Sequence, residues 1–208
     1  MPDAKEKKIF YGLKNVHYAL LTETESDGKI VSTYGEVKRW PGAVNITLDP
    51  NGNPTIFSAD NGAYYTIPNN RGYQGDYECA RIPDDVRVDI SGNKVDDNGF
   101  IVETDKDEFG YFALMFEFET DVNADRYVFY KVGLSQRPSV ASETVDVNSD
   151  VTPGTEKVTF VAMPQTDDVE IDGVTKHLIK AKTSKSVDKT AYDGFYESVY
   201  IPSFEGES

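Results

Sequence analysis

Cysteine and histidine are scarce in this chain of 208 residues, which contains one cysteine, Cys79, and two histidines, His17 and His177. A single cysteine cannot form a disulfide within the chain, and the first residues show no export-signal pattern, so we expect synthesis in a reducing cytoplasm. Neither histidine belongs to a nucleophile signature, the three residues lack zinc-ligand spacing, and no phosphate-binding glycine loop occurs. The sequence therefore predicts no enzyme, no metal and no cofactor.

Basic residues and long apolar runs are scarce as well. The chain has 21 Lys and Arg against 36 Asp and Glu, a formal net charge of −15. Tight binding of nucleic acid needs cations along the phosphates, which such a chain does not supply. The longest apolar run, Tyr111–Phe116, is far shorter than the roughly 20 residues that cross a bilayer. We therefore expect neither tight DNA binding nor a membrane partner.

The apolar residues that are present suffice for one core. Hydrophobic residues make up 38% of the chain and aromatic residues 12%, and a chain of this length usually forms one domain or two small ones. Nothing in the composition marks a domain boundary. We expect a single domain over residues 1–208, with flexible ends at residues 1–8 and 203–208.

Alternation of apolar residues predicts mainly extended structure. The clearest case is the pair Tyr111–Thr120 and Arg126–Leu134, which a short connection joins into a hairpin. In the first strand Phe112, Leu114, Phe116 and Phe118 are expected on one face, and Ala113, Met115, Glu117 and Glu119 on the other. In the second strand Val128, Tyr130, Val132 and Leu134 are expected to share a face. The other predicted strands are 16–22, 29–39, 43–48, 63–67, 73–82, 100–103, 157–163, 177–182 and 195–201.

One helix is predicted, in the short segment that follows Pro83 and ends near Gly92, with Asp84 and Asp85 in its first turn. Many strands with a single helix indicate a mainly β protein, either a β-sandwich or a β-barrel with one short flanking α-helix. The segments 49–61 and 135–156 are predicted to be loops.

Two groups of acidic residues match the patterns of functional sites, and an ordinary structural role also explains each of them. Asp49, Asn51, Asn53 and Asp60 occupy ligand positions of a calcium-binding loop, but Pro54 stands where that loop needs glycine, so a turn is favoured.

Glu117 and Glu119 are spaced like a pair of catalytic carboxylates acting on sugars, but a solvated strand face has the same spacing and is favoured.

An ordered series of stretches resembles the major tail proteins of long-tailed bacteriophages that infect Gram-positive hosts, the phi-thirteen-like group. No single stretch is specific, but the series runs in order over most of the chain. The stretches are KNVHYAL (14–20), YGEVKRWPGAVNITLDP (34–50), FSADNG (57–62), GYQGDYE (72–78), IPDDVR (82–87), LMFEFE (114–119), RPSVA (137–141), KVTFVAMP (157–164) and YDGFYESVY (192–200).

The resemblance implies a structural subunit of a phage tail tube, assembled in the host cytoplasm and part of the virion. Subunits would form hexameric rings that stack into a conduit for DNA, with the tape-measure, tail-terminator and distal tail proteins as partners and DNA passing transiently. It assigns residues 49–70 to contacts between rings. The candidates for ring stacking are Asp49, Asn51, Asn53, Phe57, Tyr64 and Tyr65, and those for the lumen are Asn45, Thr47, Glu117 and Glu119.

Several alternatives stay open at this stage. Tyr64 and Tyr65 also fit ordinary core packing. A carbohydrate-binding β-sandwich module, with sugars bound by exposed aromatics and acidic loops, is the alternative function, and a glycoside hydrolase using Glu117 or Glu119 is a further rival.

Overall fold

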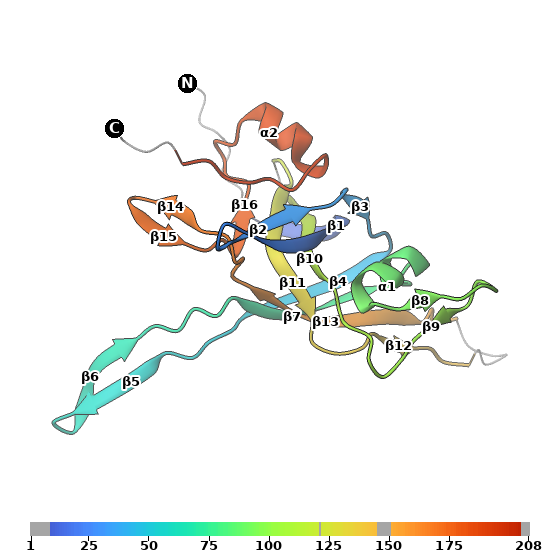
Figure 1. The fold of residues 1–208 in the computed structure, drawn as a ribbon, viewed down its shortest axis with the longest axis horizontal. Coiled ribbons are helices and arrows are strands. Elements are labelled where there is room, and N and C mark those ends of the chain that lie inside the picture. Colours follow the sequence, from blue (N-terminus) through green and yellow to red (C-terminus); the bar gives the residue numbers. More distant parts are fainter. Residues whose placement is uncertain (1–8, 121, 145–150, 205–208) are drawn as a thin grey trace.

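The structure, a computed structural model, describes residues 9–120, 122–144 and 151–204. It is mainly β, with one large antiparallel sheet, three two-stranded sheets and short helices (Figure 1). The elements are β1 (Phe10–Ser26), β2 (Lys29–Tyr34), β3 (Lys38–Arg39), β4 (Ala43–Pro50), β5 (Thr55–Ala59), β6 (Gly62–Ile67), β7 (Tyr73–Cys79), α1 (Asp84–Ser91), β8 (Lys94–Val95), β9 (Ile101–Val102), β10 (Tyr111–Thr120), β11 (Asp125–Leu134), β12 (Ser139–Ala141), β13 (Thr155–Met163), β14 (Val169–Ile171), β15 (Val174–Lys176), β16 (Lys180–Lys182), α2 (Lys189–Asp193) and the 3₁₀ turn η1 (Gly194–Tyr196).

The large sheet has the strand order β2-β1-β10-β11-β13-β7-β4, with β3 paired to β1, β16 to β11 and β12 to β13. The chain crosses from one end of this sheet to the other between β3 and β4. Strand β3 pairs with β1, and β4, which starts soon after β3, pairs with β7. No closed barrel forms in the described part of the chain, so the barrel form of the prediction is not seen. The prediction of a mainly β protein is confirmed. Among the described residues, no helix is long and apolar enough to span a membrane.

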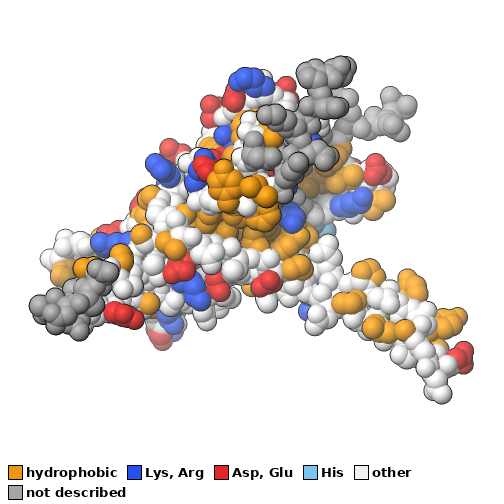
Figure 2. All heavy atoms as spheres, turned by 180° about the vertical axis from the view of Figure 1, so that it is seen from behind, with side chains coloured by type: hydrophobic (Ala, Val, Ile, Leu, Met, Phe, Trp, Pro, Cys, Tyr) orange, Lys and Arg blue, Asp and Glu red, His pale blue; other side chains and the backbone are white. Residues whose placement is uncertain are grey.

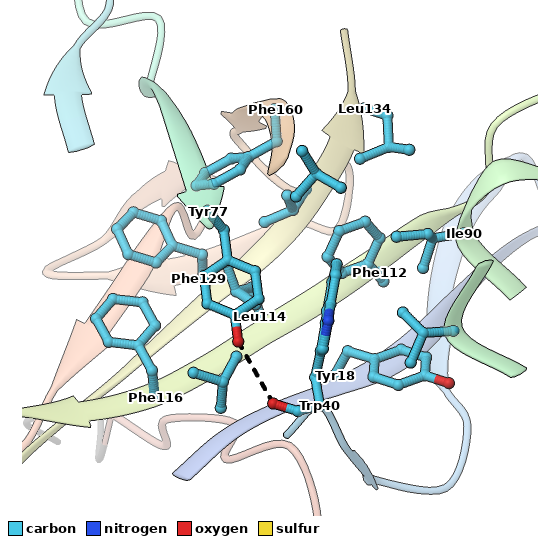
Figure 3. Packing of buried hydrophobic residues seen from close by; sticks show 14 of the residues in the cluster. Tyr18, Trp40, Tyr77, Ile90, Phe112, Leu114, Phe116, Phe129, Leu134 and Phe160 are labelled. Atoms are coloured by element: carbon cyan, nitrogen blue, oxygen red, sulfur yellow. Dashed lines mark hydrogen bonds between the residues drawn. The ribbon is translucent and has the colours of Figure 1, made fainter. Parts of the chain in front are cut away.

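The main core lies between the two halves of the curved sheet and under α1 (Figure 3). Trp40, 1% exposed, packs edge-on against Tyr77, with ring centroids 4.9 Å apart. The Tyr77 hydroxyl donates to the Trp40 carbonyl at 3.4 Å. Val86 and Ile90 of α1 complete this core. The apolar face predicted for β10 therefore packs inward.

Helix α1 follows the prediction closely. Gly92 ends it in the left-handed conformation, with φ of 71°, which glycine adopts without a steric penalty. Asp84 and Asp85 lie in the first turn, although no side chain caps the helix. A second short helix, α2, was not predicted, and Asp188 caps it by accepting hydrogen bonds from two backbone N–H groups.

A second core cluster covers the opposite face of β1, β10 and β11. Ala113 and Met115 of β10 pack there with Phe195 and Val199 from the C-terminal segment. The prediction of a half-buried strand is therefore wrong for β10, which is covered on both faces. The prediction of a strand at 195–201 is also wrong, because that segment forms η1 and irregular chain.

A β-bulge changes the facing of residues along β11. Phe112 pairs with Val132 but Leu114 pairs with Phe129, so β11 has one residue more than β10 over this interval. Val132 joins the main core while Val128 belongs to the second cluster. The prediction that Val128, Tyr130, Val132 and Leu134 share a face is therefore wrong.

Candidate functional site

A β-hairpin, β5–β6, projects from the body of the molecule as an arm (Figure 1). We call residues 51–70 the arm. Its turn is formed by Asp60 and Asn61, with φ of 52° and 61°, the positive pair that a type I′ turn requires. Strand β6 was predicted, but β5 falls in a segment predicted to be a loop, so that prediction is corrected.

Backbone hydrogen bonds fix the base of the arm. The Asn51 N–H donates to the Gly72 carbonyl at 2.9 Å, and the Arg71 N–H donates to the Asn51 carbonyl at 3.0 Å. Gly52 has φ of 126°, and a Cβ there would overlap the carbonyl oxygen of Asn69. The two segments of the arm therefore meet where only glycine fits, which anchors the arm to the sheet.

The arm exposes large apolar side chains on both strands. Tyr64 is 71% exposed, Tyr65 63% and Phe57 58%, and the rings of Phe57 and Tyr64 meet edge to face at 6.4 Å. Ile56 and Ile67 are also at least half exposed. Figure 2 shows these apolar side chains along the projecting arm. Core packing of Tyr64 and Tyr65, one of the two readings left open, is contradicted.

Such an arm has the properties of a binding element. An isolated two-stranded hairpin is at best marginally stable in water, and contiguous exposed apolar side chains usually mark an interaction site. Contact with another surface would both bury these side chains and support the hairpin.

The residues that suggested calcium do not converge. Asp49 lies exposed in β4 opposite Gln74, whereas Asp60 is at the turn of the arm. Asn51 and Asn53 lie between them at the base. No group of three or more His, Cys, Asp and Glu side chains in the described ranges is arranged to hold a metal ion.

The outer face of β4, β7 and β13 is polar. Asn45 and Thr47 are exposed on β4, opposite Glu78 and Asp76 of β7. Asp76 accepts a hydrogen bond from the Thr159 hydroxyl at 2.6 Å, and its backbone N–H donates to the Thr47 hydroxyl at 3.3 Å. We call Asn45, Thr47, Asp76 and Glu78 the polar face.

Sequence reasoning placed Asp76 and Glu78 in a strand but did not select them as site residues. The signal was available in YQGDYE, where polar residues alternate with Tyr73, Gly75 and Tyr77.

Glu117 is not on a solvated face. It is 3% exposed, and its carboxylate accepts from Arg126 Nε at 2.9 Å and from Asn15 Nδ2 at 2.8 Å. The Tyr196 hydroxyl also donates to it, at 3.3 Å. Burial, together with the Glu117 charge, raises the pKa of Tyr196 well above its ordinary value. The expectation of a solvated face is wrong for Glu117, because the C-terminal segment covers it, and this residue leaves the lumen set.

Glu119 remains partly exposed, with 40% of its side chain accessible, and pairs with Lys14. The two carboxylates therefore lie in different environments. The rival hydrolase reading needs both in one open site, and the burial of Glu117 does not favour it.

The histidines and the cysteine lie on separate elements. Burial lowers the pKa of His17, whose Nδ1 donates to the Asn15 carbonyl at 2.8 Å, and nearby Arg39 lowers it further. His177 lies near Asp168, 3.9 Å away. Burial raises the pKa of the Cys79 thiol to about 11, which keeps the thiol protonated. None of the three contacts another, so the described residues form no Cys–His pair.

No model of a known protein family matches the chain, and no curated protein matches its sequence.

Proposed function

We propose that this chain is a structural subunit that assembles with copies of itself into the tail tube of a long-tailed bacteriophage. The observation that carries the proposal is the arm, an anchored hairpin whose large apolar side chains are exposed. In this proposal the arm contacts the adjacent ring through Phe57, Tyr64 and Tyr65, and the fold is the β-sandwich with a flanking helix that the resemblance implies.

The polar face fits the wall of a DNA conduit. Asp76 and Glu78 add negative charge beside Asn45 and Thr47, and Lys157, which lies opposite Glu78 and 3.6 Å from Asp76, offsets part of it. Carboxylates repel phosphates, and screening restricts this effect to about 8 Å at physiological salt, so DNA passes without binding. Hexameric rings, the tape-measure, tail-terminator and distal tail proteins, and a place in the virion belong to the same proposal.

The test removes the arm and leaves the core intact. Deleting Asn53–Pro68 joins Gly52 to Asn69, which the paired backbone of Asn51 and Arg71 already holds close together. We expect the wild-type chain to form rings or hollow tubes in negative-stain electron microscopy, and the deletion variant to remain a folded monomer by light scattering and circular dichroism.

The matched control is Thr66→Ser, a small change on the same hairpin that leaves Phe57, Tyr64 and Tyr65 in place and should preserve tubes. Tubes formed equally well by the deletion variant would remove the arm from the interface. A wild-type chain that stays monomeric at every concentration and binds a glycan would instead favour the carbohydrate-binding module.

A further inference from the structure

A second exposed apolar surface lies at the end of the molecule opposite the arm. Figure 1 places β8, β9 and β12 at one end of the longest axis and β5–β6 at the other. Phe100 is 70% exposed, Val140 67%, Val95 57% and Val102 42%. We call these four residues the end patch.

Polar contacts hold the parts of the end patch together. Asp96 accepts from the Phe100 N–H at 2.7 Å, and the Phe100 carbonyl accepts from the Asp96 N–H at 2.9 Å. This closed turn presents the Phe100 ring to solvent. Arg137, which precedes β12, donates to the Thr104 carbonyl at 2.8 Å and pairs with Glu103 next to Val102. The β8–β9 hairpin and β12 therefore form one surface.

The charge around the end patch restricts what can bind there. Residues 84–108 contain nine Asp and Glu against three Lys and Arg, a formal charge of −6, in a chain of net charge −15. Most surfaces of a second copy are repelled by this end. The arm carries one charged residue, Asp60 at its turn. Lys94 and Lys106 beside the end patch make no ion pair within the described ranges, so they are available to Asp60.

We infer that the end patch is the surface on which the arm of a second copy docks. The inference rests on the proposed function, which assigns the arm to contacts between copies, and names the other half of that contact. Because the two surfaces are different and lie at opposite ends, each contact leaves an arm and an end patch free, and the assembly extends without closing along this direction.

Disulfide trapping tests the contact directly. Tyr64→Cys and Phe100→Cys are prepared as separate single variants and mixed under mild oxidation, and the native Cys79 does not interfere because it is 0% exposed. Val174→Cys on β15, 54% exposed, is the matched bystander. We expect about ten-fold more cross-linked dimer from Tyr64→Cys with Phe100→Cys than with Val174→Cys, since docking raises the local thiol concentration. Equal yields overturn the inference.

A second variant separates this inference from the proposed function. Phe100→Asp with Val140→Asp adds charge to side chains that already face solvent, so the fold is retained, and we expect tube formation to be lost. If this double variant forms normal tubes while the arm deletion does not, the end patch is wrong and the proposed function stands. If both form normal tubes, the contact between arm and end patch is wrong and so is the role of the arm, whereas a wild-type chain that forms no tubes would count against the proposed function itself.

Discussion

Replacing Glu117 by Leu should destabilise the folded chain strongly. Glu117 is 3% exposed, and its partner Arg126 keeps only 16% of its side chain accessible. Removal of the carboxylate leaves a guanidinium with no counter-ion in a nearly dry site. Breaking a buried ion pair from one side typically costs about 3–5 kcal/mol.

Other contacts of Arg126 set the expected cost at the lower end of that range. The guanidinium lies over the Tyr192 ring, 3.8 Å from its centroid, and also donates to the Tyr192 carbonyl. These contacts survive the substitution and retain part of the compensation for the charge. We therefore expect about 3 kcal/mol, which in a chain of this size lowers the melting temperature by about 6–12 °C.

A double-mutant cycle tests the reasoning. Glu117→Leu, Arg126→Met and the combined variant are compared by urea titration in the arm-deleted background, so that self-assembly does not contribute. The combined variant should be more stable than Glu117→Leu, because two apolar side chains replace the pair with no buried charge left over. A loss of less than about 1 kcal/mol in the free energy of unfolding for Glu117→Leu is typical of a solvent-exposed ion pair. Such a result would refute the placement of the C-terminal segment over Glu117.

Three other perturbations have defined outcomes. Gly72→Ala should reduce the yield of folded protein severely, measured by circular dichroism, because Gly72 has φ of 97° and a Cβ would overlap the Ala162 carbonyl oxygen. The lowered pKa of His17 means that the unfolded chain binds more protons just below pH 6.5, so stability falls as pH drops through that window; His17→Gln should show a smaller fall in melting temperature from pH 7 to pH 5. Asp76→Lys with Glu78→Lys should permit folding and assembly but slow DNA release from particles, and unchanged release kinetics would remove these residues from the conduit wall.

The alternation of apolar and polar side chains predicted where strands occur more reliably than it predicted which face of the sheet each side chain occupies. The β10–β11 hairpin was predicted from period-two patterns and is present. The extra residue of β11 lies between the partners of Phe112 and Leu114, and no glycine or proline marks it there. The bulge moves Val132 and Leu134 to the other face of the sheet. Its position depends on how two strands align, and the sequence of one strand does not contain that information.

The burial of Glu117 depends on residues far away in the chain. Tyr196 and Phe195, which cover that face of the sheet, follow Glu117 by more than seventy residues. Their alternating pattern resembles a strand, but their apolar side chains pack onto an existing sheet without joining it. A local sequence pattern indicates that a residue needs burial. Only the tertiary arrangement determines which surface buries that residue. The arm shows the converse, since the strand pattern of β6 correctly predicted a strand although every residue of β6 is exposed.

Strong negative charge and one nearly neutral apolar arm act together in the proposed assembly. At a net charge of −15, random approach of two copies is opposed over about a Debye length, roughly 8 Å at physiological salt. Attraction is then concentrated where the arm buries Phe57, Tyr64 and Tyr65, whose aromatic surface supplies the gain. Between rings, a contact that does not include the arm would bring two acidic surfaces together and be penalised, which is how repulsion contributes to specificity in the proposed assembly. In the proposed assembly, the acidity that keeps free subunits apart therefore also favours the contact that the arm makes over other contacts between rings.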